Sequence, residues 1–128
     1  MPAAAAIPNV LDNYRASASA NPTSAEAQSN LGWGYYGQHQ YDDAIQAFQA
    51  ALALDNGFID AHYGLGLAFK EAGRGPQAVP QFEQVVKLTG QLDGGSRSVM
   101  LARLARAHIN RIERGNWHIE SDPSPIIG

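Results

Sequence analysis

The sequence repeats itself with a period of 34 residues, and this repeat restricts the fold more than any other feature of the chain. A shift by that distance superposes identical residues: Ala27 on Ala61, Leu31 on Leu65, Gly32 on Gly66, Ala44 on Ala78, Phe48 on Phe82, and Leu54 on Leu88. The chain therefore contains two tandem units, residues 25–58 and 59–92, which we expect to fold alike.

Apolar residues within each unit have the spacing of helices. In the first unit Leu31 and Tyr35 form one stripe, and a second stripe begins at Tyr41 after a short break at residues 39–40. Steps of three and four residues are typical of an amphipathic helix. Each unit is therefore predicted to be a hairpin of two helices joined by a tight turn.

The second unit has two prolines near the start of its second helix. We expect a first helix over Ala61–Ala72, a turn at residues 73–75, and a second helix that begins at Pro76, where a missing N–H does no harm. Pro80 removes a backbone hydrogen bond four residues later, so it should kink or delay this helix.

Small and large residues at matched positions make both units resemble the tetratricopeptide repeat (TPR). The pattern is carried by Gly32, Tyr35, Ala44, Phe48, Ala51 and Asp55 in the first unit, and by Gly66, Phe69, Ala78 and Phe82 in the second. Gln28 and His62 depart from it, since the family usually has tryptophan there. The resemblance implies an all-α fold, an α-solenoid of antiparallel helix hairpins with about six helices.

The glycines and alanines of this pattern have a packing role. Two antiparallel helices approach each other closely only where one side has no bulk, so small residues form a hole that aromatic rings fill. The residues assigned to this packing are Gly32, Tyr35, Ala44, Phe48, Gly66, Phe69, Ala78 and Phe82. Gly34 and Gly37 are not explained by it, and each lowers helix propensity by about 1 kcal/mol relative to alanine.

Half repeats are expected at both ends of a TPR-like domain over residues 9–115. Residues 9–24 match the second half of a unit, with Asn9 as its N-cap, and residues 96–115 are predicted to form a capping helix that Ser96 starts and Gly115 ends. A repeat array needs such caps to cover its end faces. Residues 1–8 are expected to be a flexible N-terminus, and residues 116–128 an extended tail.

The predicted capping helix is rich in arginine. It holds five of the nine basic residues: Arg97, Arg103, Arg106, Arg111 and Arg114. Contact with nucleic acid is one explanation, and a solvated outer face is the other. The formal net charge of -3 gives nucleic acid no general support, and a terminal helix needs a charged outer face. We therefore expect no nucleic-acid partner.

Motifs for chemistry are not found in the sequence. The chain has no cysteine, no His-Glu-x-x-His, no Gly-x-Ser-x-Gly and no phosphate-binding loop, and its four histidines are scattered. We expect no catalytic residue, no metal and no cofactor, and an enzyme on a helical array stays an alternative for which no residue is nominated. The N-terminus lacks the basic start of a signal peptide, and no apolar run is long enough to span a membrane, so a cytoplasmic protein without membrane insertion is expected.

The resemblance implies a binding groove. In the TPR family the first helices line a concave wall that receives peptides or partner helices, and the matching positions here are Ser29, Trp33, Tyr36, Tyr63, Leu67 and Lys70, with Arg106 from the capping helix. Exposed aromatic rings suit binding because they offer a large contact area at low entropy cost. The alternative is that Trp33 and Tyr36 pack against the N-terminal half repeat or the C-terminal tail. The family's carboxylate clamp is not expected, because its lysine and asparagine are absent.

The expected function is that of a non-enzymatic protein–protein interaction module, as an adaptor, scaffold or assembly factor. The alternative is a small structural subunit of a larger complex, held through its convex surface and its apolar tail. The tail's anchors are Trp117, Ile119, Ile126 and Ile127. They could dock into the protein's own groove, into a neighbouring copy, which would be self-association, or into another subunit.

Overall fold

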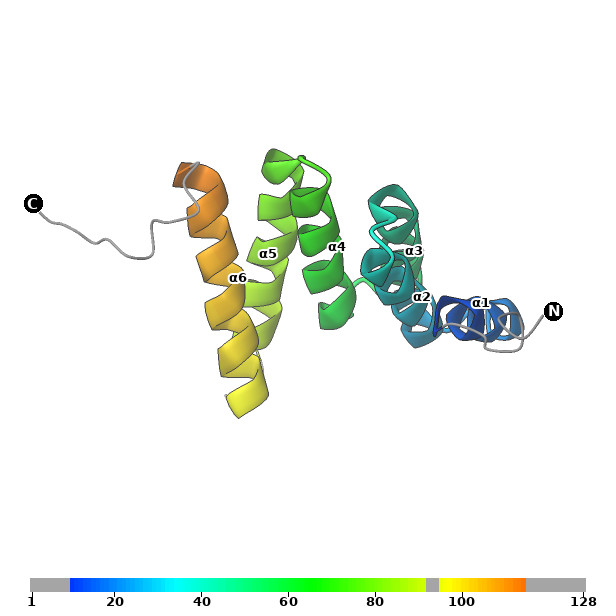
Figure 1. Ribbon diagram of the computed structural model, residues 1–128. Helices are drawn as coiled ribbons and strands as arrows, with labels where there is room; N and C mark the ends of the chain where they lie inside the picture. Colours follow the sequence, from blue (N-terminus) through cyan, green and yellow to red (C-terminus); the bar gives the residue numbers. More distant parts are fainter. Residues whose placement is uncertain (1–9, 92–94, 115–128) are drawn as a thin grey trace, which may run out of the picture.

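The computed structural model describes residues 10–91 and 95–114, and within these ranges the chain forms six helices and no strand. The helices are α1 (Val10–Ala20), α2 (Ala25–Gly37), α3 (Tyr41–Leu54), α4 (Ile59–Glu71), α5 (Gly75–Gly90) and α6 (Ser96–Arg114). Helices α2 and α3 form one hairpin and α4 and α5 a second, while α1 and α6 lie at opposite ends of the array (Figure 1). The predicted all-α solenoid of helix hairpins is confirmed.

The two hairpin turns repeat the period seen in the sequence. His39 in the first turn and Gly73 in the second both have positive φ, 61° and 80°, and they are 34 positions apart. Glycine adopts this left-handed conformation without strain, whereas a histidine does so at a cost. At the start of the first unit, the hydroxyl of Ser24 caps α2 by accepting a hydrogen bond of 3.1 Å from the N–H of Ala27.

Two phenylalanines at matched positions form the centres of the hairpins. Phe48 and Phe82 are completely buried, and the packing around them leaves no room for side chains on the facing helices. A Cβ added at Gly32 would lie 2.8 Å from the ring of Phe48, and one added at Gly66 would lie 2.7 Å from the ring of Phe82. A Cβ added at Gly64 of α4 would lie still closer to the ring of Phe48. The helices therefore contact these rings through their backbones.

One glycine of α2 packs differently from the expectation. A Cβ at Gly34 would lie 2.8 Å from Tyr14 of α1, so this glycine allows α1 to approach, and the view that packing does not explain it was wrong. Tyr35 is half buried and packs against the core, while the guanidinium of Arg15 lies 5.5 Å from its ring centre and Arg15 Nε donates to its hydroxyl at 3.5 Å. Gly37 has no neighbour within 4 Å of an added Cβ.

Helix α5 does not show the delay that was expected from Pro80, and the expected kink stays a prediction. The helix begins at Gly75 and continues past Pro80 to Gly90, so this proline does not delay it. The missing N–H of Pro80 would have bonded the carbonyl of Pro76, four residues earlier in the first turn, so one hydrogen bond is lost near the helix start.

Several predictions fall outside the described residues: those on Asn9, on Gly115, on residues 1–8, on the C-terminal tail and on the side chain of Ser96. The division into repeats and half repeats stays a prediction.

Candidate functional site

Three aromatic side chains of the first hairpin, Trp33, Tyr36 and Tyr41, form a cluster that we call the aromatic cluster. Trp33 packs edge-on against the buried ring of Phe48 at 5.1 Å and against Tyr36 at 5.8 Å, and Tyr36 packs edge-on against Tyr41 at 5.6 Å. All three are half buried. Their contacts with the core and with each other fix the rings, while part of each remains open to solvent.

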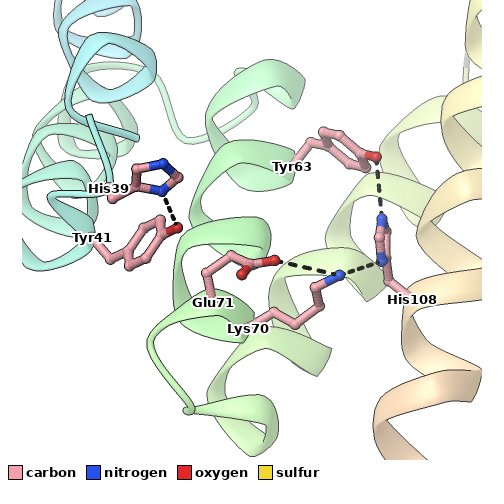
Figure 2. A network of polar contacts seen from close by, with 6 residues as sticks. All are labelled: His39, Tyr41, Tyr63, Lys70, Glu71 and His108. Carbon is pink, nitrogen blue, oxygen red and sulfur yellow. Dashed lines mark hydrogen bonds and ion pairs between the residues drawn. The ribbon is translucent and has the colours of Figure 1, made fainter. Parts of the chain in front are cut away.

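The hairpin turn positions the end of this cluster. His39 Nδ1 lies 2.7 Å from the hydroxyl of Tyr41, and the two rings meet edge-on with their centres 5.8 Å apart (Figure 2). The left-handed backbone of His39 belongs to the turn that aims the imidazole at Tyr41. A conformation that costs free energy in a histidine is thus combined with a specific polar contact beside the aromatic cluster.

A polar network joins α4 to α6. Lys70 Nζ lies 3.4 Å from His108 Nδ1, and the hydroxyl of Tyr63 lies 3.4 Å from His108 Nε2 (Figure 2). Glu71 Oε2 lies 3.8 Å from Lys70 Nζ. The imidazole also stacks on Phe82, with ring centres 4.9 Å apart and an angle of 18° between the rings. His108 therefore connects α6 to both helices of the second hairpin.

His108 is neutral at pH 7. Burial, together with the smaller effects of the positive charges of Lys70 and Arg111, lowers its pKa to about 4. Because an ammonium group only donates, Nδ1 must accept from Lys70, so the single proton of the ring lies on Nε2 and is donated to the oxygen of Tyr63. The hydroxyl proton of Tyr63 is not used in this contact, and an incoming acceptor can receive it.

The electrostatics of Tyr36 connect the aromatic cluster to α4. Burial raises the pKa of Tyr36, and the charge of Glu71 raises it further, with smaller effects from Tyr41 and Tyr63. These groups are therefore close enough to influence one another. Burial also raises the pKa of Tyr63. Both phenols are protonated at neutral pH, so the surface presents hydroxyl groups that donate and accept hydrogen bonds.

The structure brings most of the predicted groove residues together, but not all of them. Trp33 and Tyr36 lie in the aromatic cluster, Tyr63 and Lys70 lie in the polar network, and half-buried Leu67 packs against the core. Ser29 is only 2% exposed, and its hydroxyl has no hydrogen-bond partner among the described residues. Since its neighbours cover it, Ser29 offers no surface to a partner, contrary to the expectation.

Arg106 is the other exception. Its side chain is exposed, and together with Val86 and Thr89 of α5 it lines a hollow of about 240 Å³. His108 takes the place beside α4 that was expected for Arg106. Two positions along a helix are about 200° apart, so these side chains point to nearly opposite faces. His108 was not predicted as a groove residue because α6 has no motif that fixes its position in the family pattern.

The other polar groups support the fold. His62 is 5% exposed, and its Nε2 donates to the backbone carbonyl of Asn56 at 2.7 Å, while its Nδ1 lies 2.9 Å from the side-chain amide group of Gln81, whose NH₂ can donate to it. This imidazole ties the turn before α4 to α5.

Within the described ranges, no three histidine, aspartate or glutamate side chains are grouped so that they could hold a metal ion. None of the helices in these ranges is long and apolar enough to cross a membrane.

Comparisons with known proteins point to one fold. Residues 34–73 match a family model described as the TPR repeat. The structure is similar to the Sgt2 TPR domain from Aspergillus fumigatus, with a TM-score of 0.65 and 20% identity over 92% of this chain and 75% of that chain.

Two structures of MamA are also similar, both with a TM-score of 0.56. Their identities are 22% and 21%, over 81% and 91% of this chain and 65% and 68% of theirs. Similarity at these identities establishes the fold alone. No curated protein matches the sequence.

Proposed function

The chain carries a TPR repeat and has the fold of TPR domains, and from this premise we propose that it is a non-enzymatic module that binds an extended peptide or a helix of a partner protein. The repeat and the fold support a protein–protein interaction module in general. Our proposal adds the place of binding: the surface formed by the aromatic cluster and by Tyr63 and Lys70 of α4. As a binding module it would act as an adaptor, a scaffold or an assembly factor.

The observation that carries this proposal is the half-buried state of the aromatic cluster. Each ring is held on one edge by other rings, so little side-chain entropy remains to be lost when a partner covers the open edge. Rings of this kind supply the largest contributions in protein interfaces. The hydroxyl groups of Tyr36 and Tyr63 can pair with the backbone of a bound peptide, which fixes its position.

The titratable side chains of this surface make contacts that hold its parts in place. His108 and Lys70 are the titratable groups with the most specific contacts in this surface, and each is engaged in positioning the other. His62 is buried and bonded on both nitrogens. In neither case does the geometry place a base next to a nucleophile.

A binding comparison of three proteins tests the proposal. A partner captured by the wild-type protein is measured by titration calorimetry against wild type, against Tyr36→Ala plus Tyr63→Ala, and against Gln49→Ala, an exposed position on α3 outside this surface. We expect the double variant to bind at least about 30-fold more weakly, since aromatic anchors contribute 2 kcal/mol or more. Circular dichroism establishes that both variants are folded. Unchanged affinity in a folded double variant contradicts the groove proposal.

The alternative of a stably incorporated subunit makes a different prediction. Native, untagged protein in an extract would then elute from a size-exclusion column only at the mass of a larger complex. Its tail anchors lie outside the described residues.

A further inference from the structure

Charge changes sign along the array. The first three helices with their turns, residues 10–58, hold one basic residue, Arg15, and five acidic residues, Asp12, Glu26, Asp42, Asp43 and Asp55. Residues 59–91 hold three of each sign. Helix α6 holds five arginines and a single acidic residue, Glu113. Because α1 and α6 lie at opposite ends, the described part of the molecule is acidic at one end and basic at the other (Figure 1).

The outer face of α6 has the composition of an interface. One stripe with helical spacing runs along it and consists of Val99, Arg103, Arg106, Asn110 and Arg114, and Met100 and Leu104 form a second stripe beside it. Val99, Met100 and Leu104 are 45%, 61% and 42% exposed, and they are three of the five large apolar side chains most exposed in the described residues. We call this surface the α6 outer face; it is about 22 Å long at 1.5 Å per residue.

A solvated cap does not account for this face. Such a cap mixes charges of both signs and avoids large apolar side chains. Here Arg103 and Arg106 are three positions apart on the same stripe, where like charges repel each other. No carboxylate among the described residues forms an ion pair with Arg103, Arg106 or Arg114. The α6 outer face therefore gains from an acidic partner.

The exposed surface of α1 has complementary properties. It carries Val10, which is 58% exposed, and short side chains on the remaining turns: Asn13, Ala16, Ser17 and Ala20. Short side chains let a second helix approach closely, and they leave room for the long arginine and methionine side chains of α6. Asp12 of α1 is exposed and lies 3.7 Å from the exposed Arg15 of the same helix, so the excess of acidic charge at this end comes from α2, α3 and the turn after α3. The pKa of Arg15 is raised by Tyr35 first and then by Asp12 and Asp43, so Asp43 of α3 also lies near α1.

We propose that copies of this chain associate head to tail, with the α6 outer face of one copy against α1 of the next. Such a contact pairs the basic end with the acidic end and covers the apolar side chains of both. It would also form a hairpin across two copies, since α6 resembles a first helix and α1 a second helix of a repeat. The contact joins two different surfaces, so further copies can add. It does not use the aromatic cluster, and it is therefore independent of the proposed function.

Sedimentation velocity of the full chain over a range of concentrations tests this association. At low ionic strength the average mass of the wild type should rise with concentration, and 0.5 M salt should weaken the association because it screens the charges. Arg103→Glu plus Arg106→Glu should raise the dissociation constant at least about tenfold. The control, Arg74→Glu plus Lys87→Glu, changes the net charge equally but leaves α6 intact, so it should associate like the wild type.

A charge exchange makes the test specific for the two ends. Mixing the Arg103→Glu plus Arg106→Glu variant with an Asp12→Arg plus Asp43→Arg variant should restore association in a complex of the two. A wild-type chain that stays monomeric in low salt up to millimolar concentration overturns the proposal. Association that persists in the Arg103→Glu plus Arg106→Glu variant also overturns it. So does association that is lost when residues 116–128 are removed but is kept in that variant. The variant Tyr36→Ala plus Tyr63→Ala should associate as strongly as the wild type. That result would show that the association does not depend on the proposed binding surface.

Discussion

Adding one methyl group at Gly64 tests whether backbone contact with Phe48 holds α4 against the first hairpin. The Cβ of Gly64→Ala would lie 2.4 and 2.5 Å from two ring carbons of Phe48, at least about 1 Å inside the usual carbon–carbon separation of about 3.5–4.0 Å. The ring cannot move aside easily. It is 0% exposed, Trp33 packs on it at 5.1 Å, and the backbone of Gly32 faces it.

Two opposing terms set the expected magnitude. Overpacking of a tight core costs about 1–3 kcal/mol, whereas alanine in place of glycine inside a helix gains about 1 kcal/mol. With three ring atoms closer than 3.0 Å we expect the upper part of the cost, so the net loss in the free energy of unfolding is about 1–2 kcal/mol. Gly37→Ala is the matched control, because it has no neighbour within 4 Å and should gain about 0.5–1 kcal/mol.

The assay is thermal and urea unfolding followed by circular dichroism at the helix band. At roughly 4 °C per kcal/mol, the melting temperatures of the two variants should differ by about 6–12 °C, with Gly64→Ala the lower. In a Phe48→Leu background the same alanine should cost less, because a smaller side chain leaves space. If Gly64→Ala melts at or above the wild-type temperature, the inference that α4 packs through its backbone is refuted.

Three further predictions concern polar side chains that are buried or half buried. Ser29→Ala should raise the free energy of unfolding by about 0.5–1 kcal/mol in urea titrations, because it removes a buried hydroxyl without a partner and favours the helix; a loss would indicate a hidden hydrogen bond. His62→Ala should lower it by about 2–3 kcal/mol, more than His39→Ala at the exposed turn, since two buried hydrogen bonds are lost. The pKa of His108 is about 4 in the native state and 6.5 when unfolded, so the unfolded chain binds more protons and stability falls as the pH falls from 6.5 towards 4. Urea midpoints at pH 7 and pH 5 should therefore differ less in His108→Phe than in the wild type.

The fold could be predicted from the sequence because its determinants are local and occur twice. A 34-residue shift places Gly32 on Gly66 and Phe48 on Phe82. Gly32 faces Phe48 in the first hairpin, and Gly66 faces Phe82 in the second. Contacts between hairpins were harder to predict. Gly64 of α4 makes room for Phe48 of α3, and Gly34 of α2 makes room for α1. The spacing of residues within one unit does not identify such partners.

The candidate site was predictable only where a motif fixed the register. Trp33, Tyr36 and Tyr63 belong to units with matched residues, so their faces followed from the pattern. Helix α6 has no such motif, and its predicted register in the family pattern differs by two residues from the observed one. Arg106 was therefore expected beside α4, where the structure has His108. Ser29 failed for another reason: its position in the pattern was clear, but its burial depends on how closely neighbouring helices approach a side chain this small.

The physical link between the two proposed surfaces is α6. Its inner side chain His108 stacks on Phe82 and contacts Tyr63 and Lys70, which belong to the proposed groove, while its outer face carries Arg103, Arg106 and Arg114. A neutral imidazole can accept from Lys70, but a protonated one faces the ammonium group as a like charge. Protonation of His108 would therefore loosen α6 from α4, and it would disturb the groove and the charged end together. A helix that serves two surfaces couples them through its own packing, even though no partner needs to contact both.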